Sequence, residues 1–265
     1  MADRFNGHWE QIGEGTPIVC ISGFASGNWL FHRLVTPLAR EHAFILPDNR
    51  GMGNSPPAQF PYDLNDLADD LLALMDRLGH ARFGLIGLSM GGFIAQLLAS
   101  RVPERITRMV LMCTSSNGAA FRSLFPILPR EQVAMIYQLH REERVRAALS
   151  EPFCPVLTTR YPETFDYVME QRIRNEPDLS QVLLQYDAVA RFFAGPPVDL
   201  AAIQTPTLIL SGALDVIVPP ANAQLLASLL PHAELALVPE TDHLFFLEKV
   251  NEVAQRIGSF LHPVV

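Results

Sequence analysis

The stretch that decides the fold is residues 83–92, which read Phe-Gly-Leu-Ile-Gly-Leu-Ser-Met-Gly-Gly. An apolar run of strand character, 83–88, leads directly into a segment with helical spacing. Gly87, Ser89 and Gly91 form the pattern G-x-S-x-G, which is typical of a sharp strand-to-helix turn that exposes a nucleophilic serine. The Met90 N–H then lies at a helix N-terminus, where backbone donors favour an anion. The alternative is a glycine-rich turn that merely contains a serine, so the pattern needs an acid and a histidine as partners.

Both partners follow, each just past the end of a later apolar strand. Asp215 comes after the run 207–211, and His243 comes after the run 233–238. Parallel strands bring their carboxyl ends to one edge of a sheet, so the three side chains are expected to meet there. We expect His243 to take the proton of Ser89 and return it to the leaving group. Asp215 accepts the other imidazole N–H and fixes the tautomer.

Each partner has a simpler interpretation. Asp215 could be an ordinary turn residue, as most loop aspartates are. Asp242 is the nearest rival acid, but a carboxylate adjacent in sequence rarely reaches its neighbour's ring in useful geometry. We interpret Asp242 as a loop or helix-capping residue. The order Ser, Asp, His on suitable strand ends favours the catalytic assignment.

This order of motifs resembles that of the α/β-hydrolase superfamily. Its members commonly carry His-Gly-x after an early strand, with the N–H of x facing the oxyanion. This chain has Ser22-Gly23-Phe24 after the apolar run 17–21. The resemblance therefore implies an oxyanion hole formed by the backbone N–H groups of Phe24 and Met90. Ser22 replaces the histidine, which changes the hydrogen bonds that brace the loop.

A second loop carries the resemblance further. Residues 48–55 read Asp-Asn-Arg-Gly-Met-Gly-Asn-Ser, which is similar to a loop of small carboxylesterases, enol-lactonases and cofactor-free haloperoxidases. The glycine spacing does not match a dinucleotide-binding loop, and no ribose-binding acid follows at the required distance. We expect a structural loop in which Asp48 and Arg50 position the backbone.

The coarse pattern predicts one α/β-hydrolase fold, with a mostly parallel sheet covered by helices on both faces. The core comprises residues 1–113 and 198–265, and a helical cap at 114–197 is inserted between these two parts of the sequence. The cap follows the run 107–112, which corresponds to the sixth strand of this superfamily. The expected strands lie near 8–12, 17–22, 43–47, 83–88, 107–112, 207–211 and 233–238. The expected helices lie near 28–40, 63–79, 90–101, 131–149, 162–174, 179–193, 220–230 and 244–261.

Composition narrows the classes of function. The chain has 265 residues, 49% of them hydrophobic, and a net charge of −8 without basic runs, which argues against a nucleic-acid partner. Cys20, Cys113 and Cys154 are widely spaced, so they suggest neither a disulfide framework nor a zinc site. Cys20 and Cys113 are expected to be small core residues. No signal pattern or membrane-length apolar run is present, and we expect a cytoplasmic protein with no membrane partner.

The cap is rich in aromatic residues and methionine, which favours an apolar acyl pocket. Residues 119–195 hold nine arginines and ten acidic residues. This balance is typical of solvated helix faces, so we assign no carboxylate clamp; Arg122 is the first arginine to test for one. The cap arginines could also bind a carrier protein, a possible partner that nothing else in the sequence supports.

Together these residues predict a serine hydrolase that cleaves a small-molecule carboxylic ester, resembling small capped carboxylesterases. Enol-lactonase, thioesterase, carrier-protein methyl ester esterase and C–C bond hydrolase activities share the same motifs, and the sequence does not separate them. The resemblance implies no metal and no organic cofactor. A hydrolase-fold receptor with little turnover is the alternative from another class.

Overall fold

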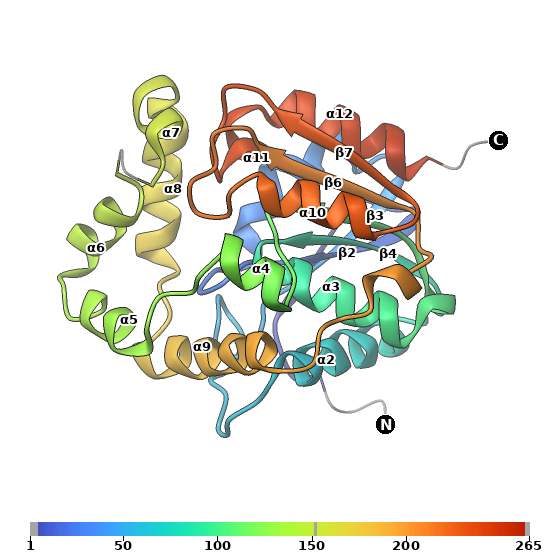
Figure 1. The fold of residues 1–265 in the computed structure, drawn as a ribbon, viewed down its shortest axis with the longest axis horizontal. Helices are drawn as coiled ribbons and strands as arrows, with labels where there is room; N and C mark the ends of the chain where they lie inside the picture. The colour runs from blue at the N-terminus through green and yellow to red at the C-terminus, as the bar shows by residue number, and fades with distance from the viewer. Residues whose placement is uncertain (1–4, 151–152, 263–265) are drawn as a thin grey trace.

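The computed structural model describes residues 5–150 and 153–262, which form a seven-stranded sheet in the order β1-β3-β2-β4-β5-β6-β7 (Figure 1). β1 is antiparallel to β3, and all other neighbouring pairs are parallel. Each predicted strand is confirmed to within one residue at either end. The strands are β1 (Trp9–Ile12), β2 (Thr16–Ile21), β3 (His42–Pro47), β4 (Phe83–Leu88), β5 (Ile106–Met112), β6 (Thr207–Gly212) and β7 (Ala233–Val238).

Helices cover both faces of the sheet, and the strand residues alternate between two hydrophobic cores. In β2, Val19 and Ile21 pack on one face, whereas Ile18 and Cys20 pack on the other. This alternation follows from the two-residue period of a strand. The first face is covered by α2 (Leu64–Arg77), α3 (Met90–Arg101) and α10 (Ala221–Leu229). The second is covered by α1 (His32–Val35), α11 (Phe245–Glu248) and α12 (Val250–Leu261).

The strand order reverses direction at β2. From β2 the chain first adds β3 on one side and then crosses to add β4 on the other. The connections that leave β2 and β4 therefore lead to opposite sides of the sheet. Ligands of open α/β sheets bind at such a switch point. Phe24 and Ser89 lie in these two connections.

Six helices of the described ranges are inserted between β5 and β6, the position predicted for the cap. Figure 1 shows α5 to α8 beyond the carboxyl ends of the strands, while α9 runs beside α2. The division into core and cap domains stays a prediction. The inserted helices are α4 (Ala119–Leu124), α5 (Arg130–Ile136), α6 (Arg141–Ala148), α7 (Pro155–Arg160), α8 (Pro162–Arg174) and α9 (Leu179–Ala194).

Several helices that were predicted to be continuous are interrupted in the structure, so these predictions are wrong. The helix expected at 131–149 is two helices, α5 and α6, because the Arg144 guanidinium donates to the carbonyls of Tyr137 and Leu139 in the turn between them. The segment 28–40 is a short α1 flanked by two 3-10 turns, η1 (Asn28–Phe31) and η2 (Thr36–Leu38). The segment 244–261 is divided at Lys249, whose backbone is not helical. Helices α4 and α7 were not predicted.

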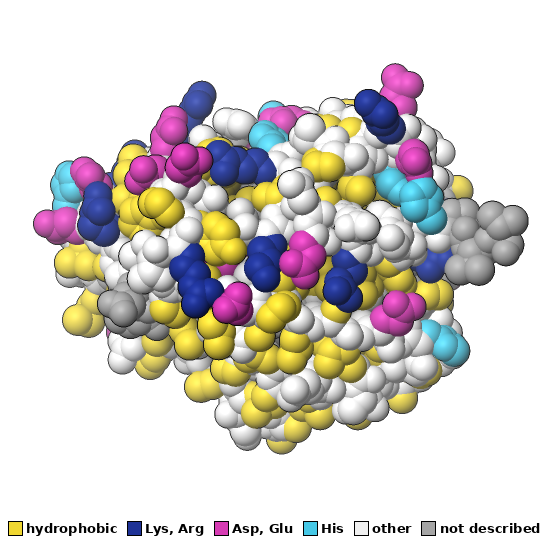
Figure 2. All heavy atoms as spheres, turned by 90° about the horizontal axis from the view of Figure 1, so that it is seen from above, with side chains coloured by type: hydrophobic (Ala, Val, Ile, Leu, Met, Phe, Trp, Pro, Cys, Tyr) yellow, Lys and Arg dark blue, Asp and Glu magenta, His cyan; other side chains and the backbone are white. Residues whose placement is uncertain are grey.

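The charge distribution on the surface and the length and hydropathy of the helices bear on the predictions of no nucleic-acid partner and no membrane partner. Figure 2 shows basic and acidic side chains interleaved on one face, with no large patch of a single sign there. None of the helices in the described ranges is both long and apolar enough to span a bilayer. The cytoplasmic location stays a prediction.

The tight turn after β4 generates the first testable prediction. A Cβ added at Gly91 would overlap the Ile21 carbonyl oxygen of the neighbouring strand. Gly91→Ala should therefore reduce the free energy of unfolding by about 3 kcal/mol, the upper range for overpacking. Gly79→Ala is the control, because Gly79 has a φ of +77° and no atom within 4 Å of its added Cβ. Backbone strain alone should cost the control about 1 kcal/mol. Equal losses in urea unfolding would contradict the steric account.

Candidate active site

Ser89 lies in a strained turn between β4 and α3. Its backbone has φ 52° and ψ −116°, a region that non-glycine residues rarely adopt. Two contacts hold it there: the Ser89 N–H donates to the Met112 carbonyl at 2.8 Å, and the Thr114 hydroxyl donates to the Ser89 carbonyl at 2.6 Å. A Cβ at Gly87 would lie 2.6 Å from the Gly91 carbonyl oxygen, so the turn requires glycine. Strain of this kind is found at functional sites.

Asp215 and His243 form a hydrogen-bonded pair, as the sequence predicted. Nδ1 of His243 lies 2.7 Å from Oδ2 of Asp215. The other carboxylate oxygen accepts the backbone N–H groups of Ile217 and Val218 at 2.8 and 2.9 Å. The Asp215 side chain is fully buried, so its orientation is fixed. When Nδ1–H of the neutral ring donates to Asp215, the lone pair of His243 is on Nε2.

The Asp215 carboxylate stabilises the positive charge that the His243 ring acquires when it takes a proton. Burial lowers the pKa of His243, whereas the Asp215 carboxylate and its hydrogen bond to Nδ1 raise it, and the net shift is upward. A raised pKa makes Nε2 a stronger base. In the described part of the chain, no hydrogen bond joins the Ser89 hydroxyl to the His243 ring. Such bonds are often long before substrate binds.

The loop after β2 passes beside Ser89. A Cβ at Gly23 would lie 3.4 Å from the Ser89 Cβ. Among the described residues, no acceptor pairs with the Phe24 N–H, and the Met90 N–H is at the first position of α3, where the helix itself offers no acceptor. Ser22 braces this loop by donating to the Gly27 carbonyl at 3.0 Å. The serine thus supplies a brace where family members have histidine.

Two glutamines of α9, which were not predicted as functional residues, hold two loops of the core. Oε1 of Gln185 accepts the Ala25 N–H at 2.7 Å, and Ala25 has a φ of 51°. Gln181 accepts the Ala58 N–H at 2.7 Å in the same way. Both side chains are buried, and they are four residues apart on one helix face. That spacing of two amides on an otherwise apolar face was the available signal.

The loop 48–55 is structural, as predicted for Asp48. The Asp48 carboxylate accepts the N–H of Asn28 at 2.6 Å and the N–H of Asn54 at 3.0 Å. Arg50 does not position backbone: it donates twice to the Asp70 carboxylate of α2, at 2.6 and 2.8 Å. The bidentate pair ties this loop to the helix instead.

Asp242 has the capping role that the sequence suggested. Its carboxylate is fully buried and accepts the N–H groups of Val156 and Leu157 in the first turn of α7. It also accepts the N–H of Leu244 at 3.2 Å. Asp242 therefore connects the inserted helices to the loop that carries His243.

Cys113 was expected in the core, and it is buried, but it also lies beside the site. It follows β5 with a φ of 37°, and its sulfur is within 4.8 Å of ligand atoms of Asp215 and His243. Burial raises the pKa of the Cys113 thiol, so it is a neutral neighbour of the imidazole at pH 7. The sequence gave no sign of this contact, because β5 and the His243 loop are far apart in the chain.

An aromatic cluster lies between α3 and α9. Phe93 of α3 stacks on Phe192 at a centroid distance of 5.0 Å and meets Phe193 edge-on at 5.3 Å. Next to it is a hollow of about 460 Å³ lined by Arg122, Phe125, Pro126, Ile127, Ala190, Phe193 and Ala194. The Arg122 guanidinium donates to the Phe193 carbonyl at 2.7 Å, so part of its hydrogen-bonding capacity is used within the protein.

Comparison with known proteins identifies a family that matches this chain and several similar proteins. The family described as alpha/beta hydrolase fold matches residues 16–250. The chain is 30% identical to the 2-hydroxy-6-oxononadienedioate/2-hydroxy-6-oxononatrienedioate hydrolase 2 of Pseudomonas putida, over 96% of this chain and 91% of that protein. It is 28% identical to the dihydrolipoyllysine-residue acetyltransferase component of the acetoin cleaving system of P. putida, and it spans 66% of that longer protein.

Two solved structures are similar over almost the whole chain. A thermophilic esterase from Thermogutta terrifontis is 27% identical with a TM-score of 0.77, covering 96% of this chain and 92% of that one. Est816, described as an N-acyl homoserine lactone degrading enzyme, is 26% identical with a TM-score of 0.79, covering 96% of each chain.

The buried acid next to Asp242 generates a prediction about pH and stability. Burial and the neighbouring Asp242 carboxylate raise the pKa of Glu248 to about 9. The folded protein then keeps a proton that the unfolded chain loses above about pH 4.5, so the free energy of unfolding should fall as pH rises from 5 to 9. In Glu248→Gln this fall should be smaller by up to about 1.4 kcal/mol per pH unit.

The control is Glu252→Gln, which changes an exposed carboxylate four residues further on. Its unfolding free energy, measured in urea at several pH values, should follow the wild-type curve. Parallel curves for Glu248→Gln and the wild type would show that Glu248 is ionised in the folded protein.

Proposed function

Because the chain belongs to the alpha/beta hydrolase family, we propose that it is a serine hydrolase that cleaves carboxylic esters through an acyl-enzyme intermediate. One observation carries the proposal: the 2.7 Å hydrogen bond between His243 and Asp215 lies at the strand edge where the strained turn presents Ser89. A nucleophile, a base and an oriented acid are the parts that acyl transfer requires.

The proposed steps follow from these positions. Nε2 of His243 takes the Ser89 hydroxyl proton as the oxygen attacks the ester carbonyl, and Asp215 stabilises the imidazolium. The N–H groups of Phe24 and Met90 bind the oxyanion. Collapse of the intermediate releases the alcohol, which takes the proton from His243. Water then attacks the acyl-enzyme by the same proton transfers, releasing the acid and free Ser89. These steps use neither a metal nor an organic cofactor.

An apolar acyl group is the proposed substrate feature. The phenylalanine cluster on α3 and α9 begins four residues after Ser89, and the adjoining hollow has mainly apolar side chains. Lactone cleavage is the second candidate, since Est816 is described as an N-acyl homoserine lactone degrading enzyme. A lactone is a cyclic ester, so both candidates use the same steps.

Labelling with a fluorophosphonate probe tests the proposed nucleophile. Wild-type protein should react with one equivalent of the probe, and peptide mass spectrometry should find the adduct on Ser89. Ser89→Ala should remain folded, lose labelling, and lose ester hydrolysis by about 10⁴-fold or more, because triad residues act as a unit. Folded wild-type protein that is not labelled would favour a receptor. Retention of a tenth of the turnover in Ser89→Ala would exclude Ser89 as nucleophile.

The two neighbouring aspartates should separate into different roles. Asp215→Asn should lower kcat by about 10⁴-fold, because the imidazole tautomer is lost. Asp242→Asn should lower kcat less than tenfold and instead lower the melting temperature, since one of its helix-capping contacts is weakened, which costs about 1 kcal/mol. Steady-state kinetics and calorimetry on both variants would check this. A larger loss of kcat in Asp242→Asn would assign the acid role to Asp242.

A substrate series tests the acyl pocket. For p-nitrophenyl esters, kcat/KM should rise severalfold per added carbon until the pocket is full, because each buried methylene contributes about 0.8 kcal/mol. Acyl homoserine lactones in the same assay compare the second candidate directly. A preference for acetyl esters, or for acyl chains that end in a carboxylate, would refute the apolar pocket. The latter result would make Arg122 the first residue to mutate.

A further inference from the structure

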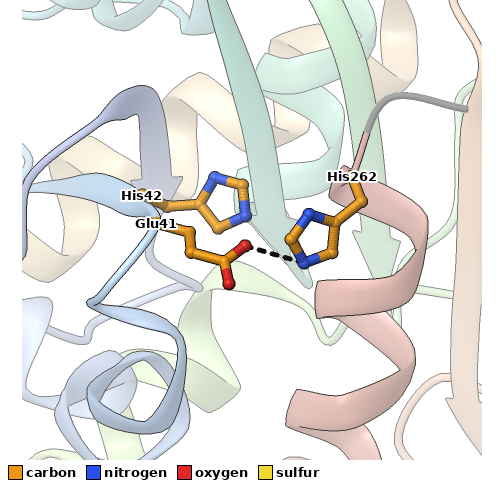
Figure 3. A group of neighbouring side chains, drawn as sticks. All are labelled: Glu41, His42 and His262. Atoms are coloured by element: carbon orange, nitrogen blue, oxygen red, sulfur yellow. Dashed lines mark ion pairs between the residues drawn. The ribbon is translucent and has the colours of Figure 1, made fainter. Parts of the chain in front are cut away.

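Three side chains that can bind a metal ion meet at the edge of the sheet opposite the strand ends that carry Ser89. Glu41 precedes β3, His42 is the first residue of β3, and His262 directly follows α12. Figure 3 shows the two imidazole rings side by side with the Glu41 carboxylate next to them, and the ring planes are tilted by 52°. One ligand atom from each of the three lies within 4.8 Å of the other two.

His42 is the unusual member of this group. It is only 4% exposed, and neither of its ring nitrogens has a hydrogen-bond partner among the described residues. Buried polar atoms in folded proteins are nearly always paired, so an imidazole in this state requires an explanation. A neutral imidazole carries one lone pair, which is a good ligand for a transition metal.

We propose that Glu41, His42 and His262 form a binding site for a divalent transition metal ion of the Zn²⁺ type. Two imidazole nitrogens and one carboxylate oxygen make a common zinc ligand set, and water completes a tetrahedron. Bond lengths of about 2.0–2.1 Å place tetrahedral ligand atoms roughly 3.3 Å apart. The buried His42 is fixed, whereas Glu41 and His262 are exposed and free to close the remaining distance by small side-chain rotations.

The ion pair already present explains only part of this group. Oε2 of Glu41 lies 2.9 Å from Nε2 of His262, which satisfies two exposed side chains but leaves both His42 nitrogens unpaired within the described ranges. The site is also at the C-terminal end of α12, a helix of 12 residues whose dipole favours a cation there. Mg²⁺ and Ca²⁺ prefer sites made of oxygen ligands, so they should bind weakly.

The position of the site indicates a structural role. His42 begins β3, and the six residues of that strand separate it by about 20 Å from the carboxyl edge of the sheet. A bound ion would join the end of α12 to the start of β3, two segments that are 220 positions apart in the chain. Binding only to the folded state raises its stability with metal concentration.

Thermal unfolding of the EDTA-treated full-length protein tests this proposal. Zn²⁺ at about 100 times its dissociation constant should raise the melting temperature by several degrees. Isothermal titration calorimetry should show a site that takes one Zn²⁺ per chain. Mg²⁺ at the same concentration should produce no shift.

Variants locate the ion. His262→Gln and Glu41→Gln change exposed side chains, so both should fold, lose most of the Zn²⁺-dependent shift, and bind one Zn²⁺ fewer. His232→Gln changes an exposed histidine elsewhere and should keep the full shift. Cys113→Ser is the second control, because Cys113, Asp215 and His243 are another group of possible ligands. This variant should also keep the Zn²⁺-dependent shift.

Three results would overturn the proposal. They are the absence of a Zn²⁺-dependent shift in the wild type, an undiminished shift in His262→Gln, and a shift abolished by Cys113→Ser alone. The last result would place the ion beside His243.

Discussion

The close approach of Gly91 to the Ile21 carbonyl is the constraint on which the rest of the site depends. Neighbouring parallel strands β2 and β4 end side by side, and α3 must start within van der Waals contact of β2. Only glycine fits this contact, so the chain turns sharply enough to place Ser89 at a positive φ. The same approach brings the loop after β2 beside Ser89. Strain at one residue is therefore maintained by the packing of the whole sheet.

Two of the contacts between the insertion and the core lie next to the proposed site. Asp242 accepts the first N–H groups of α7, and Gln185 of α9 accepts the Ala25 N–H next to Phe24. Asp242 is adjacent in sequence to the proposed base His243, and Ala25 is adjacent to the proposed oxyanion donor Phe24.

The strands and the Asp215–His243 pair were predictable because local patterns determine them. Alternating apolar runs mark strands, and parallel strands deliver the residues after them to one edge, as for Asp215 and His243. The break in the helix expected at 131–149 was not predictable, because the turn there is stabilised by hydrogen bonds from the Arg144 side chain to specific carbonyls. The contacts of Cys113, Gln185 and His42 join segments distant in sequence, and no periodicity encodes such pairings. The catalytic roles stay predictions.

The formation of an acyl-enzyme on Ser89 is the measurement that tests the central claim most directly. Rapid mixing with a p-nitrophenyl ester should release a burst of one p-nitrophenolate per active site. Acid quenching and peptide mapping should then find the acyl group on Ser89. The buried Cys113 thiol beside His243 is a competing nucleophile. Two results would contradict the account. One is the absence of a burst in a protein that turns over the ester with slow deacylation, and the other is an acyl group on Cys113.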